Sequence, residues 1–141
     1  YGLTTLGVLP DSGKGAAGNR FDRWIFNKAT YRKDLSPEES GRLTAANMDL
    51  KLGASDRALL VGTVQPLLLE KAAGMLAGKV RSRLEVAGDV NSSADAVKAL
   101  SGAVPVVLVE QVHTSRQTYV DFEVRTVREA GADIAGVILM K

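Results

Sequence analysis

The sequence of 141 residues contains no cysteine. The chain therefore cannot form a disulfide framework, a thiolate metal site or a cysteine nucleophile. It has a single histidine, His113, with no acidic residue directly beside it, so the residues predict no metal site. No apolar run approaches the roughly 20 residues that a membrane-spanning helix needs.

The chain also lacks a phosphate loop of the form G-x-x-x-x-G-K-[ST]. The nearest match runs from Gly7 to Lys14. It is one residue too long, and Gly15 stands where the loop needs a hydroxyl for magnesium. Residues 11–18 are rich in glycine, serine and alanine, which predicts a flexible loop. The sequence therefore predicts no nucleotide or metal cofactor.

Charge gives no general indication of nucleic-acid binding, because the formal net charge is only +2. Residues 19–33 stand apart, since they hold four of the seven aromatic residues and five basic side chains. This mixture suits a membrane surface with anionic lipids or single-stranded nucleic acid. The simplest interpretation is that the aromatics pack on the domain or on a neighbouring subunit. The candidate membrane-surface residues are Arg20, Arg23, Trp24, Lys28 and Arg32.

Residues 36–53 carry the signals of one complete helix. Ser36 can cap its start, Pro37 suits its first position, and Gly53 can end it after about Leu52. An apolar face at helical spacing is formed by Leu43, Ala46 and Leu50.

From residue 56 onward strands alternate with helices, which is typical of a parallel sheet joined by right-handed crossovers. We predict a three-layer, Rossmann-like α/β domain in residues 37–141, with strand order 2-1-3-4. Residues 1–36 are predicted to be an N-terminal arm, whose first ten residues form an edge strand or an extended segment. The predicted strands span residues 58–63, 83–87, 104–111 and 134–140, and the helices between them span residues 66–77, 92–100 and 115–130. Ser92 or Asn91 is available to cap the helix at residues 92–100.

The predicted order puts strand 58–63 beside strand 104–111. Ligands of open α/β sheets bind where two such strands diverge at their carboxyl ends. Hydroxyls and a guanidinium at a helix start can bind an anion, although Thr114 or Ser115 can equally be an ordinary N-cap. The candidate ligand-binding residues at this switch point are Thr63, Gln65, Thr114, Ser115 and Arg116.

His113 and Asp89 are the other polar residues that follow predicted strands. His113 would need a partner such as Glu110 for acid–base work, so a capping or surface role is the simpler interpretation. Asp89 stands alone, whereas a magnesium or phosphoryl-acceptor site needs clustered carboxylates. No catalytic residue is predicted.

Four pieces of the sequence have the form of known motifs. Residues 6–10 read LG-x-[IL]-P, and Glu39 and Arg42 keep two of the three charges of an E-x-x-R-x-x-R helix. Residues 58–63 match a strand that enters a phosphate loop. Residues 106–116 and 128–139 form a strand–helix–strand unit with a T-S-R turn. Together they resemble the cytoplasmic part of bacterial polysaccharide co-polymerases (chain-length determinants) and the related tyrosine autokinases of capsule and exopolysaccharide synthesis.

The chain departs from this family where the kinase chemistry resides. Residues 63–67 read T-V-Q-P-L, where the kinases have a glycine-rich loop with a phosphate-binding lysine. The nearest lysine after that strand is Lys71, well inside the predicted helix. Asp89 is all that remains of a pair of aspartates, and no tyrosine cluster is present. The resemblance therefore implies a kinase-like domain that is not an enzyme.

The resemblance also implies partners and a location. Glu39 and Arg42 would contact other subunits of a homo-oligomer, and the third family charge is replaced by Ala45. A tyrosine autokinase or a polysaccharide assembly protein would be the partner. The domain itself would be soluble and lie at the cytoplasmic face of the membrane, after a membrane helix that precedes Tyr1 in a longer protein.

We therefore expect a non-catalytic domain of a protein that controls the chain length or export of capsule, exopolysaccharide or lipopolysaccharide. The alternative is a regulatory domain that binds a nucleotide or another anion at the switch point. A tyrosine autokinase is a third and weaker interpretation. Nucleic acid is not an expected partner.

Overall fold

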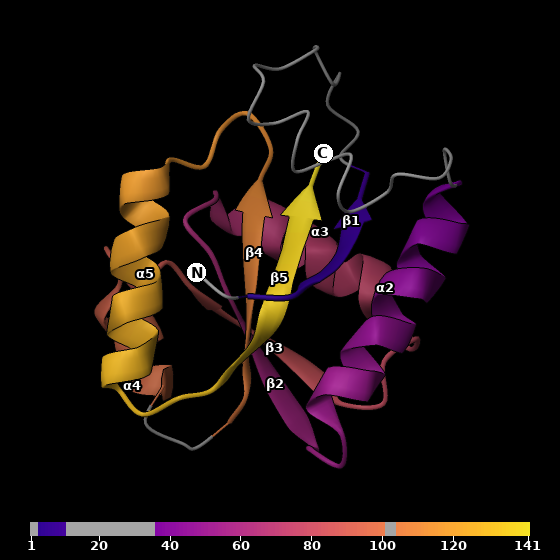
Figure 1. Ribbon diagram of the computed structural model, residues 1–141, viewed down its shortest axis with the longest axis horizontal. Helices are drawn as coiled ribbons and strands as arrows, with labels where there is room; N and C mark the ends of the chain where they lie inside the picture. Colours follow the sequence, from indigo (N-terminus) through magenta and orange to yellow (C-terminus); the bar gives the residue numbers. More distant parts are fainter. Residues whose placement is uncertain (1–2, 11–35, 101–103) are drawn as a thin grey trace.

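A computed structural model of the chain describes residues 3–10, 36–100 and 104–141. Five strands form one parallel sheet in the order β1-β5-β4-β2-β3, with helices on both faces (Figure 1). The three-layer α/β class and the order of the last four strands are thereby confirmed, and the first strand is an edge strand. The strands are β1 (Thr5–Leu9), β2 (Arg57–Val61), β3 (Arg83–Gly88), β4 (Val106–Gln111) and β5 (Ile134–Met140), and the helices are α2 (Pro37–Leu52), α3 (Pro66–Leu76), α4 (Ala94–Ala99) and α5 (Gln117–Glu129).

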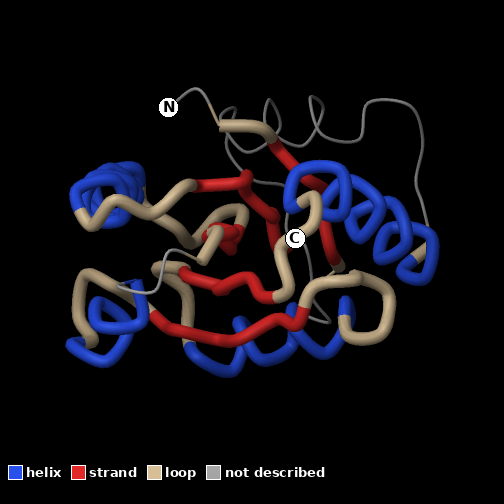
Figure 2. The backbone as a smooth tube through the Cα atoms, turned by 90° about the horizontal axis from the view of Figure 1, so that it is seen from below, coloured by secondary structure: helices blue, strands red, loops and turns tan. Residues whose placement is uncertain are grey.

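Each face of the sheet has its own hydrophobic core, and the helices lie on either side of the strands (Figure 2). On one face, α2 and α3 contribute Met48 and Leu69 to a cluster that includes Leu60 of β2. On the other face, α4 and α5 contribute Ala96 and Val124. β4 lies between the two layers and is buried along almost its whole length, as its apolar run predicts.

α2 begins and ends where the sequence predicts. The Glu39 N–H donates to Ser36 Oγ at 3.2 Å and the Ser36 N–H donates to Glu39 Oε1 at 3.4 Å, which forms a capping box. Gly53 follows the helix with a φ of 58°, a conformation that suits glycine. α3 likewise begins at Pro66, immediately after the turn that follows β2.

The predicted cap of α4 is wrong by one or two residues. Ser93 caps the helix, because its hydroxyl oxygen accepts the Ala96 N–H at 3.2 Å. In the preceding turn the Asn91 backbone N–H and the Ser92 hydroxyl donate to the Asp89 carboxylate, and the Asn91 side-chain amide donates to the Tyr119 carbonyl. The turn after β3 and its contact with α5 therefore take the side chains that the local pattern assigned to the helix.

α2 packs closely on β1 because small residues face each other. A Cβ added to Gly7 would lie 2.0 Å from Thr44 Oγ1, so only glycine fits there. Asn47 Nδ2 also donates to the Leu6 carbonyl at 2.8 Å and fixes the helix along the strand. The buried residues of α2 are Gly41, Thr44, Ala45, Met48 and Leu52.

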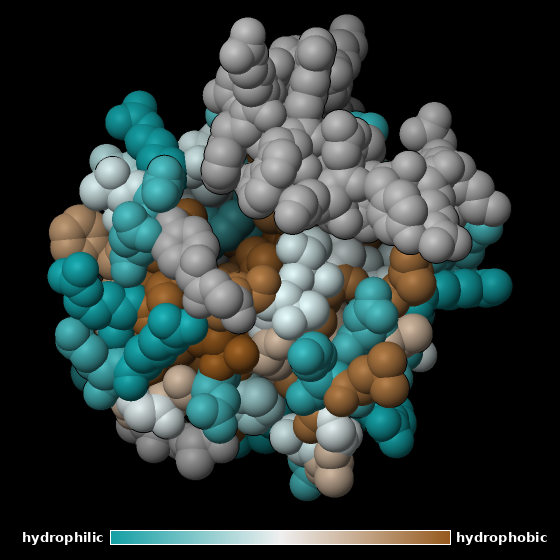
Figure 3. All heavy atoms as spheres, viewed as in Figure 1, coloured by the Kyte–Doolittle hydropathy of each residue, from teal (hydrophilic) through white to brown (hydrophobic). Residues whose placement is uncertain are grey.

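The apolar face expected for α2 consequently points outward. Leu50 is 81% exposed and Leu43 is 49% exposed, and Ala46 between them is also exposed. We call these three residues the outer stripe of α2. Figure 3 shows hydrophobic side chains at the surface along this helix. Exposed apolar residues in a continuous row are typical of a contact surface.

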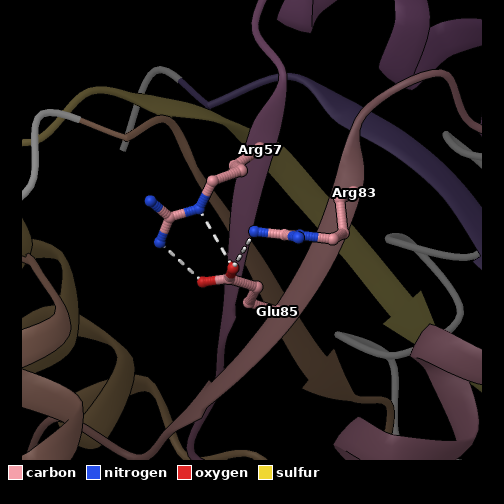
Figure 4. A network of polar contacts seen from close by, with 3 residues as sticks. All are labelled: Arg57, Arg83 and Glu85. Atoms are coloured by element: carbon pink, nitrogen blue, oxygen red, sulfur yellow. Dashed lines mark hydrogen bonds and ion pairs between the residues drawn. The ribbon is translucent and has the colours of Figure 1, made fainter.

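A cluster of charged side chains lies at β3, an edge strand. Glu85 accepts from Arg57 Nε at 3.0 Å, from Arg57 Nη2 at 2.7 Å and from Arg83 Nη2 at 3.1 Å (Figure 4). The hydrogen bonds from Arg57 lower the pKa of the Glu85 carboxyl below its usual range. Charged side chains on an edge strand discourage pairing with another strand.

Some predictions fall on residues 11–35, which lie outside the described residues. They include the flexible loop at residues 11–18 and the basic and aromatic segment at residues 19–33. Among the helices that the structure describes, none is both long enough and apolar enough to cross a membrane. The membrane-surface candidates outside the described residues are Arg20, Arg23, Trp24, Lys28 and Arg32.

Candidate functional site at the switch point of the sheet

The carboxyl ends of β2 and β4 lie side by side, and the carboxylate of Glu110 ties them together. Its Oε1 accepts the Thr63 N–H at 3.3 Å, the Thr63 hydroxyl at 2.5 Å and the Ser115 hydroxyl at 2.8 Å. Its Oε2 has one long contact among the described residues, 3.4 Å from the Thr63 nitrogen. Glu110 itself is only 5% exposed. Two candidate ligand-binding residues, Thr63 and Ser115, thus both donate hydrogen bonds to Glu110. The sequence suggested Glu110 only as an acid–base partner for His113.

Ser115 holds the turn between β4 and α5. Its hydroxyl oxygen accepts the Gln111 N–H at 2.8 Å while its proton is donated to Glu110. The alternative role of Thr114 or Ser115 as the N-cap of α5 is wrong. Arg116 occupies the N-cap position, and no side chain caps the helix there.

The other candidates lie at the surface around this point. Gln65 precedes α3 and makes no side-chain cap. Thr114 is exposed, and the Arg116 guanidinium lies over the Tyr119 ring, 6.0 Å from its centroid. His113 is exposed and has a φ of 78°, in the left-handed region that residues other than glycine seldom adopt.

The Asp89 side chain forms hydrogen bonds within a local turn. It directly follows β3, where its Oδ1 accepts the Asn91 N–H at 3.0 Å and its Oδ2 accepts the Ser92 hydroxyl at 3.3 Å. The Asn91 amide in turn donates to the Tyr119 carbonyl at 2.8 Å and ties this turn to α5. The geometry gives Asp89 the role of a turn residue.

Sequence reasoning missed Glu123, the most deeply buried acid of the described residues. It lies on the inner face of α5 and has no exposed surface. Burial, together with the neighbouring carboxylates of Glu110 and Asp89, raises the pKa of Glu123 to about 11. The helical period could have found it, because Glu123 stands three residues after Val120 and four before Val127, both on the inner face.

The hydrogen-bond donors of Thr63 and Ser115 at the switch point are already in use. An anion bound there would need the Thr63 and Ser115 groups that Glu110 occupies. The start of α3 offers little more, since Pro66 has no N–H and the Leu68 N–H donates to Gln65 O at 2.9 Å. The Glu110 carboxylate therefore already holds the Thr63 and Ser115 donors.

The two predicted oligomer-contact residues lie at the exposed start of α2. Glu39 takes part in the capping box, and Arg42 Nε lies 3.3 Å from Glu38 Oε1. Arg42 is therefore paired with an acid of its own helix, and Glu39 helps to cap the start of that helix. The outer stripe of α2 begins beside them, because Leu43 directly follows Arg42.

One glycine pattern was overlooked in the sequence. Gly13, Gly15 and Gly18 have the spacing G-x-G-x-x-G, and they lie outside the described residues. This spacing indicates a dinucleotide site only when it joins a strand to a helix. Alone, it is a weak indication.

No protein-family model matches the sequence, and no curated protein sequence matches it significantly. Solved structures do match its fold. The crystal structure of the chimerical protein CapA2B2 has a TM-score of 0.61 at 12% identity, over 99% of this chain and 94% of that chain. The BceF tyrosine kinase domain has a TM-score of 0.54 at 14% identity, over 98% of this chain and 93% of that chain. At these identities the likeness shows the fold: the chain has an α/β fold like that of a tyrosine kinase domain.

Proposed function

We propose that this chain is a non-catalytic domain of a membrane-anchored protein that controls the chain length or export of a bacterial polysaccharide. It acts by self-association and by contacts with an assembly partner such as a tyrosine autokinase. The observation that carries the non-catalytic part is the Glu110 carboxylate. It takes the Thr63 and Ser115 donors at the point where an α/β fold of this kind holds its ligand.

Electrostatics supports the same conclusion. A phosphate approaching the switch point meets the Glu110 carboxylate on the Thr63 and Ser115 donors, and like charges at short range repel. The fold likeness to a tyrosine kinase domain supports the kinase-like part of the proposal. The polysaccharide role follows from the motifs at residues 6–10 and 106–139, which resemble the chain-length and autokinase family.

Titration calorimetry with ATP, ADP and cyclic dinucleotides tests this proposal, each nucleotide being added with magnesium. We expect no binding at millimolar ligand, because every switch-point donor on Thr63 and Ser115 is already satisfied. Saturable binding that is lost when Thr63 is changed to Val would contradict the proposal. That outcome would instead support a nucleotide- or anion-binding regulatory domain.

Self-association is proposed to use the outer stripe of α2, where a second copy would cover Leu43 and Leu50. We expect Leu50→Glu to weaken the oligomer tenfold to a hundredfold, since burying a leucine contributes roughly 1.5–3 kcal/mol. Light scattering after size exclusion measures this over a range of concentrations. Leu67→Glu is the matched control, because Leu67 is 78% exposed on α3, away from the stripe. A wild-type chain that stays monomeric, or equal effects of both changes, would rule out this surface.

A further inference from the structure

Glu123 is a buried acid with no neutralising partner. It has no exposed surface, it lies on the buried face of α5, and neither of its carboxyl oxygens has a hydrogen-bond partner within the described part of the chain. An ionised carboxylate in such surroundings is strongly unfavourable. We therefore treat Glu123 as carrying a proton in the folded domain.

The charged groups that face Glu123 come from two other elements, and both are acidic. They are Glu110 at the end of β4 and Asp89 just after β3. The third neighbouring segment, the turn after β2, contributes the neutral Thr63 through its bonds to Glu110. Within the described ranges, no three acidic or histidine side chains are arranged to hold a metal ion. Among the described residues, the charged groups that act on Glu123 are both acidic, so a proton can neutralise this cluster.

Glu110 has an oxygen available for that proton. Within the described residues its Oε1 receives three donors, whereas its Oε2 has the long contact with the Thr63 N–H. The Glu123 side chain also acts on the Glu110 carboxyl group. A carboxylate oxygen can accept more than one hydrogen bond. A protonated Glu123 that donates to Oε2 would therefore complete the hydrogen bonding of both acids.

We propose that Glu110 and Glu123 form a proton-operated latch that holds α5 against the carboxyl edge of the sheet. One proton, donated by Glu123 and accepted by Glu110, joins α5 to β4. Thr63 extends the connection to the turn after β2. When the proton leaves to solvent, two buried carboxylates face each other, and α5 separates from the sheet.

The pH dependence of unfolding tests the latch. The folded chain keeps the Glu123 proton to a higher pH than the unfolded chain, so unfolding releases a proton and stability falls as pH rises above the ordinary glutamate range. Between about pH 6 and 9, the unfolding constant of the wild type should rise about tenfold per pH unit relative to Glu123→Gln. Glu129→Gln is the matched control on the exposed side of α5 and should follow the wild type.

Two further measurements separate a latch from a general loss of stability. The infrared spectrum of the wild type at neutral pH should contain the carbonyl band of a protonated carboxylic acid, which Glu123→Gln removes and Glu129→Gln retains. Hydrogen-exchange protection, corrected for intrinsic rates, should fall with pH in α5 before it falls in α2. This selective loss should be absent from Glu123→Gln.

The latch is overturned if the wild type shows no acid band at neutral pH. It is also overturned if Glu123→Gln keeps the wild-type pH slope, or if α5 and α2 lose protection together. Should Glu123→Gln fail to fold, the band and the exchange pattern of the wild type decide the matter alone.

Discussion

Replacing Gly62 by alanine is expected to destabilise the domain by about 3 kcal/mol or more. Gly62 directly follows β2, and a Cβ there would lie 2.1 Å from the Val109 carbonyl oxygen. It would also lie 3.3 Å from Leu69 Cδ2. Because the Val109 oxygen belongs to the backbone of the central strand, it cannot turn aside as a side chain can. The methyl group must therefore push β2 away from β4.

Urea unfolding of Gly62→Ala measures this loss. Gly74→Ala is the matched control, because Gly74 lies at an exposed position of α3 with nothing within 4 Å of an added Cβ. This control should raise stability by up to about 1 kcal/mol, since alanine favours the helix interior more than glycine does. Replacing glycine by alanine is thus expected to lower stability at Gly62 and to raise it at Gly74. A Gly62→Ala variant as stable as the wild type would show that β2 and β4 approach less closely.

Gly62 also shows how a sequence pattern can be misinterpreted. In the run ALLVGT, a glycine after a buried strand indicates the start of a phosphate loop. The structure gives it a packing role instead, because it lets the chain pass the Val109 carbonyl. It also brings Thr63 to within hydrogen-bonding distance of Glu110. Close backbone approach and phosphate binding require the same residue type, so the pattern alone does not separate them.

Most of the fold could be predicted because its signals are local. Pro66 at a helix start, Gly53 at a helix end and the apolar run of β4 each depend on a few neighbouring residues. The alternation of strands and helices then fixed the order of the last four strands. The N-caps of α4 and α5 were wrong because Ser92 and Ser115 have partners that lie outside their helices.

The candidate site was harder to predict because it depends on contacts across the sheet. Thr63 and Ser115 could be proposed from the strand order, whereas Glu110 needed the side-chain geometry. The helical spacing of Glu123 from Val120 and Val127 indicated an inner position. Acidic residues are seldom fully buried, however, so an exposed position was the natural assumption. In α2 the opposite holds. Leucines at the spacing typical of a core face are exposed at the surface, and mostly small residues are buried.

Replacing Gly7 by alanine is expected to cost about 2–3 kcal/mol, the second large effect. The added Cβ would lie 2.0 Å from Thr44 Oγ1 and 2.8 Å from Thr44 Cβ, so α2 must move away from β1. The Asn47 bond to the Leu6 carbonyl would be stretched as the helix moves. Urea unfolding measures the loss. Gly41→Ala is the control, since its nearest neighbour, Lys79 Cδ, is at an ordinary 3.7 Å.

A double-mutant cycle with Thr44→Ala identifies the cause of this loss. The Thr44 hydroxyl is buried and has no hydrogen-bond partner among the residues that the structure describes, so its removal alone should change stability little. In the Gly7→Ala background it removes the closer of the two clashes, and we expect it to recover about 1 kcal/mol or more. Recovery should be incomplete, because the 2.8 Å approach of the two Cβ atoms remains. Strictly additive losses would mean that Gly7 is needed for the conformation of β1 and not for the approach of α2.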